Sequence, residues 1–216
     1  MVPYNFNLID FRSFTLVDPN KPIRTRVAGE KVKRIVFHCT DANGWTADRL
    51  SRFFVEERGF PICGYHYYIR EDGVYHMVGD NIISYHAAGY NSTSIGFSID
   101  YNPTLADRLN QDVHPIIFDT AQWLAAWLCL KFKIAPIKGN LVGHRELFGT
   151  GWIKDKQDKP SLRKTCPGLR INLNAFRYNV ARRVQEYIKI NENPDLVVDG
   201  VWGPKSQTAL EIGKWA

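Results

Sequence analysis

The sequence lacks three features, and each absence excludes a class of protein. The chain of 216 residues has no run of about 18 apolar residues, so we expect no insertion into a membrane. Its first residues, Met1 to Asn7, show no basic stretch followed by an apolar one, and we therefore expect no secretory signal peptide. The cysteines are too few and too widely spaced for a disulfide framework, which favours reduced thiols: Cys39, Cys63, Cys129 and Cys166.

Acidic residues are fewer than basic ones, and this imbalance bears on the partner of the chain. Lys and Arg number 28 against 22 Asp and Glu, a net charge of +6 that favours an anionic partner such as nucleic acid, a membrane surface or a bacterial wall. The sequence shows no recognition helix and no row of stacking aromatic residues, so we expect no nucleic-acid partner. A soluble protein that is basic without such a partner is the alternative.

Hydrophobic residues make up 44% of the chain, which suits a globular protein of one domain with a small appendage. Short apolar runs predict buried strands at 34–38, 94–99 and 141–143. An Asp-Gly pair in the turn 70–73 lies between two β-prone runs and predicts a hairpin. The N-terminal residues show no sustained periodicity, so we expect an irregular arm over 1–30 that wraps the domain.

Three helices are expected among and after these strands. The first begins at the N-cap Thr46 and ends at Gly59, and the second opens on a capping pair formed by Asp119 and Gln122. The third is an amphipathic helix over 177–190. Together the elements predict an α/β (α+β) fold in which a central mixed β-sheet is flanked by helices, with a short helical C-terminal appendage.

Three side chains that suit a metal ion occur near the ends of predicted elements. His38 closes the first strand, His144 follows the third, and Cys166 lies in the segment Lys164–Gly168. A polar loop over 149–163 precedes Cys166 and is either the rim of a site or a plain solvated loop. Two imidazoles and a thiolate are one ligand short of a closed structural zinc site, and an open position is typical of catalytic zinc. The residues therefore predict a metal that takes part in chemistry.

The order of several short motifs resembles one enzyme family. The motifs are Phe37-His38-Cys39-Thr40, Gly64-Tyr65-His66-Tyr67-Tyr68-Ile69, Asp72-Gly73, His86-Ala87-Ala88-Gly89, Asn91, Ser94-Ile95-Gly96, Gly143-His144 and Lys164-Thr165-Cys166-Pro167-Gly168. In this order, the residues from about Val32 to Gly168 resemble the zinc-dependent N-acetylmuramoyl-L-alanine amidases of the type 2 family. That family includes phage lysozyme-type amidases and peptidoglycan recognition proteins.

The resemblance implies a role for each matching residue. Three residues are implied as ligands of one Zn²⁺ per chain: His38, His144 and Cys166. Two are implied as catalytic groups that act on the attacking water and the developing oxyanion: Tyr65 and Lys164. Two more are implied as contacts to the muropeptide: His86 and Asn91.

The implied reaction is hydrolysis of the amide bond between N-acetylmuramic acid and L-alanine in bacterial peptidoglycan. A non-catalytic peptidoglycan-binding or recognition protein is the alternative, but such relatives commonly lose the cysteine ligand, and Cys166 is present. Ser98 stands where some bacterial members carry a glutamate, so the pattern is closer to the phage group. Glu146 has two open roles, as an acceptor that orients a metal ligand or as a partner in a surface salt bridge.

The C-terminal residues carry a second resemblance. Asp199 to Lys205 and the residues that follow resemble small helical peptidoglycan-binding modules, which implies a catalytic domain over 1–176 and a wall-binding segment over 177–216. A purely structural tail is the alternative. The whole pattern implies a phage endolysin, a monomer held in the host bacterial cytoplasm before its release to the cell wall. A chromosomal amidase of wall recycling is the other interpretation.

Overall fold

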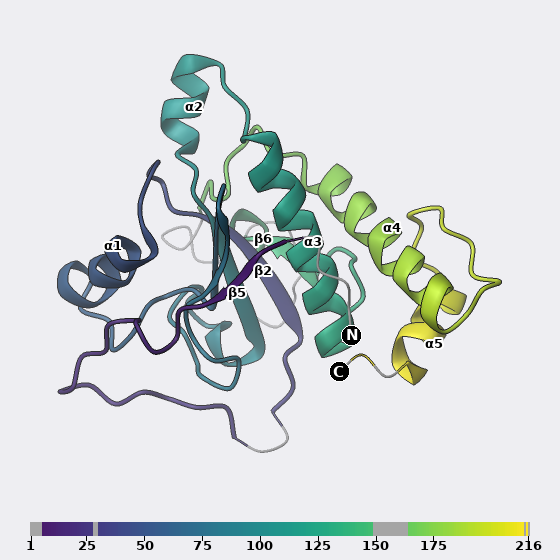
Figure 1. The fold of residues 1–216 in the computed structure, drawn as a ribbon, viewed down its shortest axis with the longest axis horizontal. Coiled ribbons are helices and arrows are strands. Elements are labelled where there is room, and N and C mark those ends of the chain that lie inside the picture. The colour runs from purple at the N-terminus through teal and green to yellow at the C-terminus, as the bar shows by residue number, and fades with distance from the viewer. Residues whose placement is uncertain (1–5, 28–29, 149–163, 214, 216) are drawn as a thin grey trace.

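A computed structural model gives the fold over residues 6–27, 30–148, 164–213 and 215. Within these residues, six strands form one sheet in the order β1-β4-β3-β5-β2-β6 (Figure 1). The strands are β1 (Leu8–Asp10), β2 (Arg34–Cys39), β3 (Tyr67–Arg70), β4 (Gly73–His76), β5 (Ser94–Ile99) and β6 (Leu141–Gly143). Neighbouring strands run parallel except β3 and β4, so the predicted mixed sheet is confirmed.

The hairpin of β3 and β4 turns at the predicted Asp-Gly pair. Gly73 has a φ of +150°, a conformation that residues with side chains rarely adopt. A Cβ atom there would also lie 2.6 Å from the backbone oxygen of Asn7. Glycine therefore lets the N-terminal segment approach the turn, and β1 pairs with β4 beside it, with Leu8 opposite Val74.

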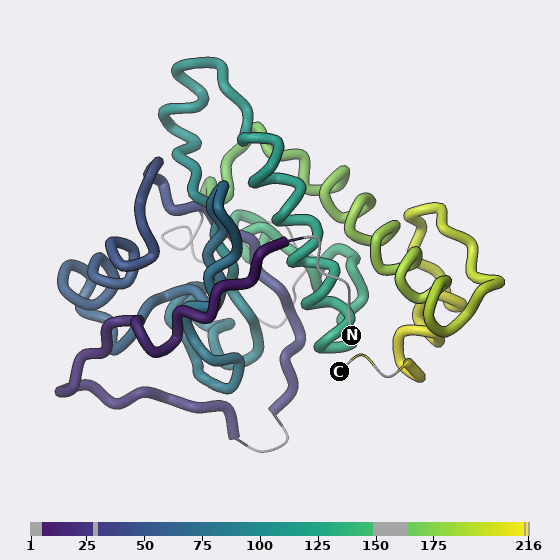
Figure 2. Tube along the Cα trace, viewed as in Figure 1, coloured from purple at the N-terminus to yellow at the C-terminus, as the bar shows by residue number. Residues whose placement is uncertain are grey.

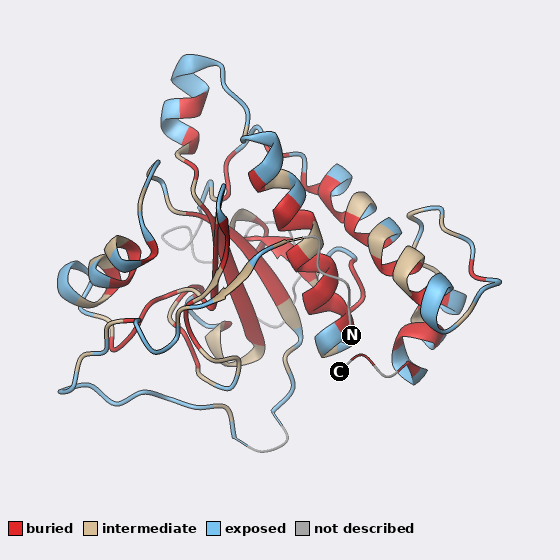
Figure 3. Cartoon of the chain, viewed as in Figure 1, coloured by how far each residue is buried: buried red, intermediate tan, exposed pale blue. Residues whose placement is uncertain are grey.

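One face of the sheet is covered by two long helices, α3 (Pro115–Phe132) and α4 (Leu173–Asn191). Odd-numbered residues of β2 and β5 point toward these helices, because side chains alternate between the faces of a sheet. The ring of Phe37 is 4.9 Å from that of Phe97 and 4.8 Å from that of Phe176 in α4. Figure 3 shows the result as a buried layer in red, with the exposed sides of α3 and α4 in blue.

The opposite face of the sheet is covered by α1 (Ala47–Arg52) and the π-helical turn that continues it (Phe53–Glu57), on the left of Figure 1. The predicted N-cap is confirmed, since Thr46 accepts a hydrogen bond from the backbone N–H of Arg49 at 3.1 Å. Leu50 packs into a second core on this face. This is the face to which the even-numbered side chains of β2 point.

The helix α3 begins earlier than the sequence indicated. The predicted capping pair of Asp119 and Gln122 is wrong, because the helix starts at Pro115, whose fixed φ suits the first helical position. Asp119 instead pairs with Arg183 of α4, and the same guanidinium donates to the side-chain oxygen of Gln122 at 3.3 Å. The two side chains therefore join α3 to α4 and do not cap α3.

The N-terminal arm is irregular only in part, which corrects the prediction. Leu8–Asp10 form the edge strand β1, and three residues are too few to show a period in the sequence. Two isolated bridges hold the rest of the arm, from Val17 to Ile62 and from Thr25 to Ile82. Figure 2 shows this purple segment passing below α1 before the chain reaches β2.

The helix α4 is longer than predicted. It spans Leu173–Asn191 and not 177–190, because Asn172 caps it by accepting from the backbone N–H groups of Asn174 and Ala175. The expected boundary between residues 176 and 177 therefore falls inside a helix that packs along α3.

After α4, the described chain forms one short helix, α5 (Pro204–Ile212), which has proline in its first turn. Gln185 of α4 is 1% exposed and fastens the turn that precedes α5. Its amide group donates to the oxygen of Val201 at 2.9 Å and accepts from the N–H of Gly200 at 2.8 Å. A buried amide with partners on both sides fixes this turn on α4, so the residues before α5 are held against that helix.

Short elements complete the described chain: α2 (Pro103–Leu109) and the 3₁₀ turns Asn91–Thr93 and His144–Glu146. The helix α2 was not predicted, although Asn102 caps it and Pro103 starts it, because so short a helix shows little periodicity. It projects beyond β5 at the top of Figure 1. None of the described helices combines the length and the apolar character needed to cross a membrane.

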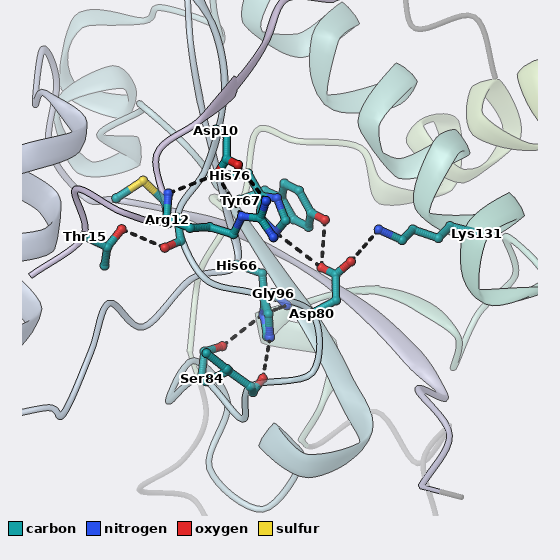
Figure 4. Close-up of polar contacts among 12 residues, drawn as sticks. Asp10, Arg12, Thr15, His66, Tyr67, His76, Asp80, Ser84, Gly96 and Lys131 are labelled. Carbon is teal, nitrogen blue, oxygen red and sulfur yellow. Dashed lines mark hydrogen bonds and ion pairs between the residues drawn. The ribbon is translucent and has the colours of Figure 1, made fainter. Parts of the chain in front are cut away.

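A polar cluster around Asp80 fastens the β3–β4 hairpin to α3 (Figure 4). The carboxylate accepts from the hydroxyl of Tyr67 at 2.7 Å and from the Nζ of Lys131 at 2.5 Å, and it lies 3.7 Å from the Nε2 of His76. Burial acts to raise the pKa of Asp80, but the interactions with His76, Lys131 and Tyr67 outweigh it and hold this pKa well below its usual range. The cluster therefore depends on an ionised carboxylate.

Candidate metal centre

The three predicted ligand residues converge at the carboxyl edge of the sheet. His38 lies near the end of β2, and His144 starts the turn after β6. The strands β2 and β6 are parallel neighbours, so both end at the same edge of the sheet. Cys166 reaches the same place from the segment that leads into α4. One ligand atom of each residue lies within 4.8 Å of the other two, and the Nδ1 of His38 is 3.7 Å from the Sγ of Cys166.

These distances and donor atoms fit a zinc ion. With the usual zinc–nitrogen and zinc–sulfur bond lengths, two ligands at a tetrahedral angle are about 3.5 Å apart. The 3.7 Å between His38 and Cys166 is close to this separation. Burial, aided by the nearby His144 and His86, lowers the pKa of His38 well below its usual value. The imidazole is therefore neutral, the form that binds a metal.

The turn that carries His144 is fixed by a buried ion pair. Glu146 is 6% exposed, accepts the N–H of Gly143 at 3.0 Å, and binds the guanidinium of Arg177 in α4 at 2.7 and 3.1 Å. Of the two roles left open for Glu146, the surface salt bridge is therefore wrong, because this pair is buried. Burial and then the charge of Lys164 lower the pKa of His144 to about 4, so this ring is neutral as well.

The segment that carries Cys166 is tied to the same turn by Arg145. The backbone N–H of Arg145 donates to the oxygen of Cys166 at 2.8 Å, and its guanidinium donates to the oxygens of Gly168 and, at 2.7 Å, Ile171. The sulfur accepts the backbone N–H of Cys39 at 3.2 Å. Burial and the neighbouring Cys39 thiol raise the pKa of Cys166 well above its usual value. This pKa describes the site without a metal. A bound metal cation beside the sulfur would favour the thiolate form of Cys166.

Tyr65 lies beside the predicted ligands. Its ring is 5.0 Å from that of His38, and its hydroxyl donates to the backbone oxygen of Cys39 at 3.4 Å. The ring of Phe54 packs edge-on against it at 5.0 Å. Burial, followed by the thiols of Cys166 and Cys39, raises the pKa of Tyr65 well above its usual value. The phenol therefore keeps its proton and serves as a hydrogen-bond donor.

Lys164 is exposed and lies two residues before Cys166. Its positive charge contributes, after burial, to the lowered pKa of His144. The predicted polar loop over 149–163 falls outside the described residues.

The two residues predicted to contact a muropeptide lie on the segment between β4 and β5. His86 is 7% exposed, and its Nδ1 lies 3.0 Å from the Nε2 of His38. Asn91 is partly buried, and its side-chain oxygen accepts the N–H of Ala87 at 2.6 Å. Contact with a muropeptide stays a prediction for both residues.

A family comparison agrees with the motifs. The model of the N-acetylmuramoyl-L-alanine amidase family matches residues 28–169, which is more than half of the chain and contains all three ligand residues. The chain belongs to this amidase family. No curated protein sequence matches it.

Solved structures that resemble this amidase include endolysins and a recognition protein. The Ph2119 endolysin from the Thermus scotoductus MAT2119 bacteriophage Ph2119 is 21% identical, with a TM-score of 0.58 over 82% of this chain and 99% of that one. The endolysine LysCS from Clostridium intestinale URNW is 21% identical, with a TM-score of 0.56 over 79% and 93%. Drosophila PGRP-LB is 22% identical, with a TM-score of 0.53 over 87% and 95%. These likenesses show the fold and confirm its predicted class.

Several residues that shape the amidase site were not predicted. Arg145 and Arg177 hold the two ligands outside the strands, and Arg26 of the N-terminal arm donates to the backbone oxygens of Ile82 and Ser94 at 2.8 and 2.5 Å. The position of Arg145 directly after the predicted ligand His144 could have indicated its role from the sequence. Arg26 and Arg177 lie too far from any ligand for spacing to indicate them.

Proposed function

We propose that this amidase uses one zinc ion to hydrolyse the bond between N-acetylmuramic acid and L-alanine in bacterial peptidoglycan. The observation that carries the proposal is the convergence of one ligand atom each from His38, His144 and Cys166 within 4.8 Å. Three protein ligands leave a coordination position open, as in catalytic zinc sites. Membership of the amidase family supplies the bond that is cleaved.

The side chains around the ligands have separate tasks in this proposal. A zinc ion held by the three ligands would polarise the substrate carbonyl and lower the pKa of a bound water. Tyr65 would donate a hydrogen bond to the attacking water or to the carbonyl oxygen as negative charge develops. Lys164, whose charge already acts on His144, would stabilise the same oxygen as a cation.

We propose that the enzyme is a phage endolysin, which breaks down the bacterial cell wall. The likeness of the fold to two endolysins supports this proposed role. A net charge of +6 would hold the enzyme on an anionic wall, an attraction that salt weakens. The proposal includes a monomer that stays in the host cytoplasm until its release.

Residues 177–216 are proposed to add wall binding. A shallow, open depression of about 440 Å³ lies between this segment and the chain after α3, and its lining includes Tyr178 and Trp202. Tyr178 is 46% exposed, so its ring is open to a ligand. A Trp202→Ala variant should lose retention on insoluble peptidoglycan and keep its activity on soluble muropeptides. Unchanged retention would favour the structural tail.

Digestion of purified peptidoglycan tests the main proposal. The products are analysed by mass spectrometry after incubation with enzyme alone, with enzyme and chelator, and with chelated enzyme restored by zinc. Intact glycan strands and free stem peptides that begin with L-alanine are expected in the first and third samples only. An intact wall that still retains the protein would favour the recognition-protein alternative.

A further inference from the structure

We propose that His86 is a positioning residue, which holds His38 in the tautomer that presents its Nδ1 atom to the metal. The proposal rests on the zinc site of the proposed function. It gives His86 a role different from the muropeptide contact that the motifs implied. The supporting residues are Ser94 and Gly96, both from the Ser-Ile-Gly motif of β5.

The direction of each hydrogen bond follows from one fixed acceptor. The hydroxyl of Ser94 lies 2.7 Å from the backbone oxygen of Tyr90, and a carbonyl only accepts, so the Ser94 proton lies in this bond. The same hydroxyl lies 3.1 Å from the Nε2 of His86 and must accept there. His86 therefore carries its proton on Nε2, and its Nδ1 has a free lone pair.

That lone pair determines the tautomer of the metal ligand. The Nδ1 of His86 lies 3.0 Å from the Nε2 of His38, so His38 donates from Nε2. The Nδ1 of His38 is then unprotonated, and this is the atom that lies 3.7 Å from the sulfur of Cys166. Metal-binding histidines commonly donate their second N–H to a carboxylate, a carbonyl or water. Here the acceptor is a neutral histidine.

The surroundings of His86 hold its ring in place. A Cβ atom on Gly96 would lie 2.5 Å from the Cγ of His86, so the ring packs directly on the glycine backbone. The next ring, His66, lies 5.8 Å from His86. His66 accepts the N–H of Gly96 at 3.1 Å, and Figure 4 shows these two residues. Asn91 fixes the segment after His86 through the N–H of Ala87. With 7% exposure and both ring nitrogens bonded, His86 fits a support better than a substrate contact.

Zinc affinity tests the role without relying on turnover. Competition with a chromophoric chelator would compare the full-length chain with His86→Phe, which keeps the ring and removes both nitrogens. Loss of such a support lowers metal affinity by about 10- to 100-fold. His86→Asn, whose side-chain oxygen can replace Nδ1 as an acceptor, should recover most of that loss. His76→Phe is the matched control, a ring stacked on Tyr67 with no part in this chain of bonds, and its affinity should not change.

Other outcomes separate this proposal from the proposed function. If His86→Phe binds zinc as tightly as the parent chain and shows a raised KM for a muropeptide, His86 is a substrate contact and the positioning role is wrong. If the parent chain binds no zinc, the proposed function itself fails. Nitrogen-15 NMR of the zinc-loaded parent chain gives a test that does not depend on a variant. A proton on the Nε2 of His38 is expected, and a proton on its Nδ1 would overturn the proposal.

Discussion

The two sides of the candidate metal centre are held by different kinds of interaction. On the sheet side, His38 is backed by neutral groups, His86 and then Ser94, through hydrogen bonds of 3.0 and 3.1 Å. On the loop side, the turn with His144 and the segment with Cys166 are held by charged groups: Arg145, Glu146 and Arg177.

The difference follows from where each ligand lies in the fold. A strand inside a sheet is already placed by its ladder of hydrogen bonds, so His38 needs only the orientation of its ring fixed. Ligand residues outside the strands have no ladder, and guanidinium groups supply several donors to the surrounding backbone and carboxylate at once. We therefore expect changes to the neutral supporting residues to lower metal affinity, and changes to the charged supporting residues to lower folding stability.

The largest effect should come from removal of a ligand on either side. His38→Ala and Cys166→Ala should each lose zinc and at least about 10³-fold of the amidase activity, because a metal supplies several kcal/mol of transition-state stabilisation. Zinc content and release of stem peptides are measured on each purified variant. Full lytic activity in Cys166→Ala would contradict the ligand assignment.

Variants of Lys164 and Tyr65 compare the two sides of the centre by their effect on kcat. Lys164→Met and Tyr65→Phe should each keep zinc and lower kcat by about 10²- to 10³-fold, as loss of one group that stabilises an oxyanion does. Zinc content is measured together with kcat on a soluble muropeptide. Loss of zinc from Tyr65→Phe would mean that the hydroxyl, through its hydrogen bond to the backbone oxygen of Cys39, supports the metal site itself.

Glu146→Gln tests the charged side through stability. The change leaves Arg177 buried without its carboxylate, and broken buried pairs cost about 3–5 kcal/mol. The free energy of unfolding is measured in urea. Glu186→Gln is the control, because its pair with Arg182 is nearly half exposed and such pairs contribute about 0–1 kcal/mol. Equal losses in the two variants would show that the ion pair at Glu146 has no special role.

The sequence predicted the strands and the ligand positions of the centre better than its charged contacts. Strands 94–99 and 141–143 were found with their exact bounds, because short apolar runs mark buried parallel strands. Motif order was enough to name the three predicted ligand residues, and the structure brings them together. His86 was named as well, although its contact with His38 is a matter of ring orientation that a motif does not show.

The charged side depends on contacts between distant segments. Arg177 meets Glu146 only because α4 packs across the end of β6, and the true start of α4 was missed by four residues. Asp119 was read as a cap for the same reason, since its partner Arg183 belongs to another helix. Spacing along the chain carries no information on such pairs, so tertiary packing decided them.

The smallest effect is expected at Asp80. This residue belongs to a charged cluster on the sheet side, so it tests whether charged groups on that side affect stability alone. Because the pKa of Asp80 is held below its unfolded value, its contribution to stability is present above about pH 4 and is lost as the pH falls through the folded value. Asp80→Asn should lower the free energy of unfolding by about 1–3 kcal/mol at pH 7, and this difference should shrink in acid.

Urea unfolding at pH 7 and pH 3 measures both parts of this prediction. Asp10→Asn is the control, since Asp10 also pairs with an arginine, Arg12, but is exposed to solvent, so its loss should change stability far less. Zinc affinity should be unchanged in both variants, because neither residue belongs to the bonds that orient His38. A loss of affinity in Asp80→Asn would show that the neutral chain depends on this charged cluster, and the two kinds of support would no longer be separate.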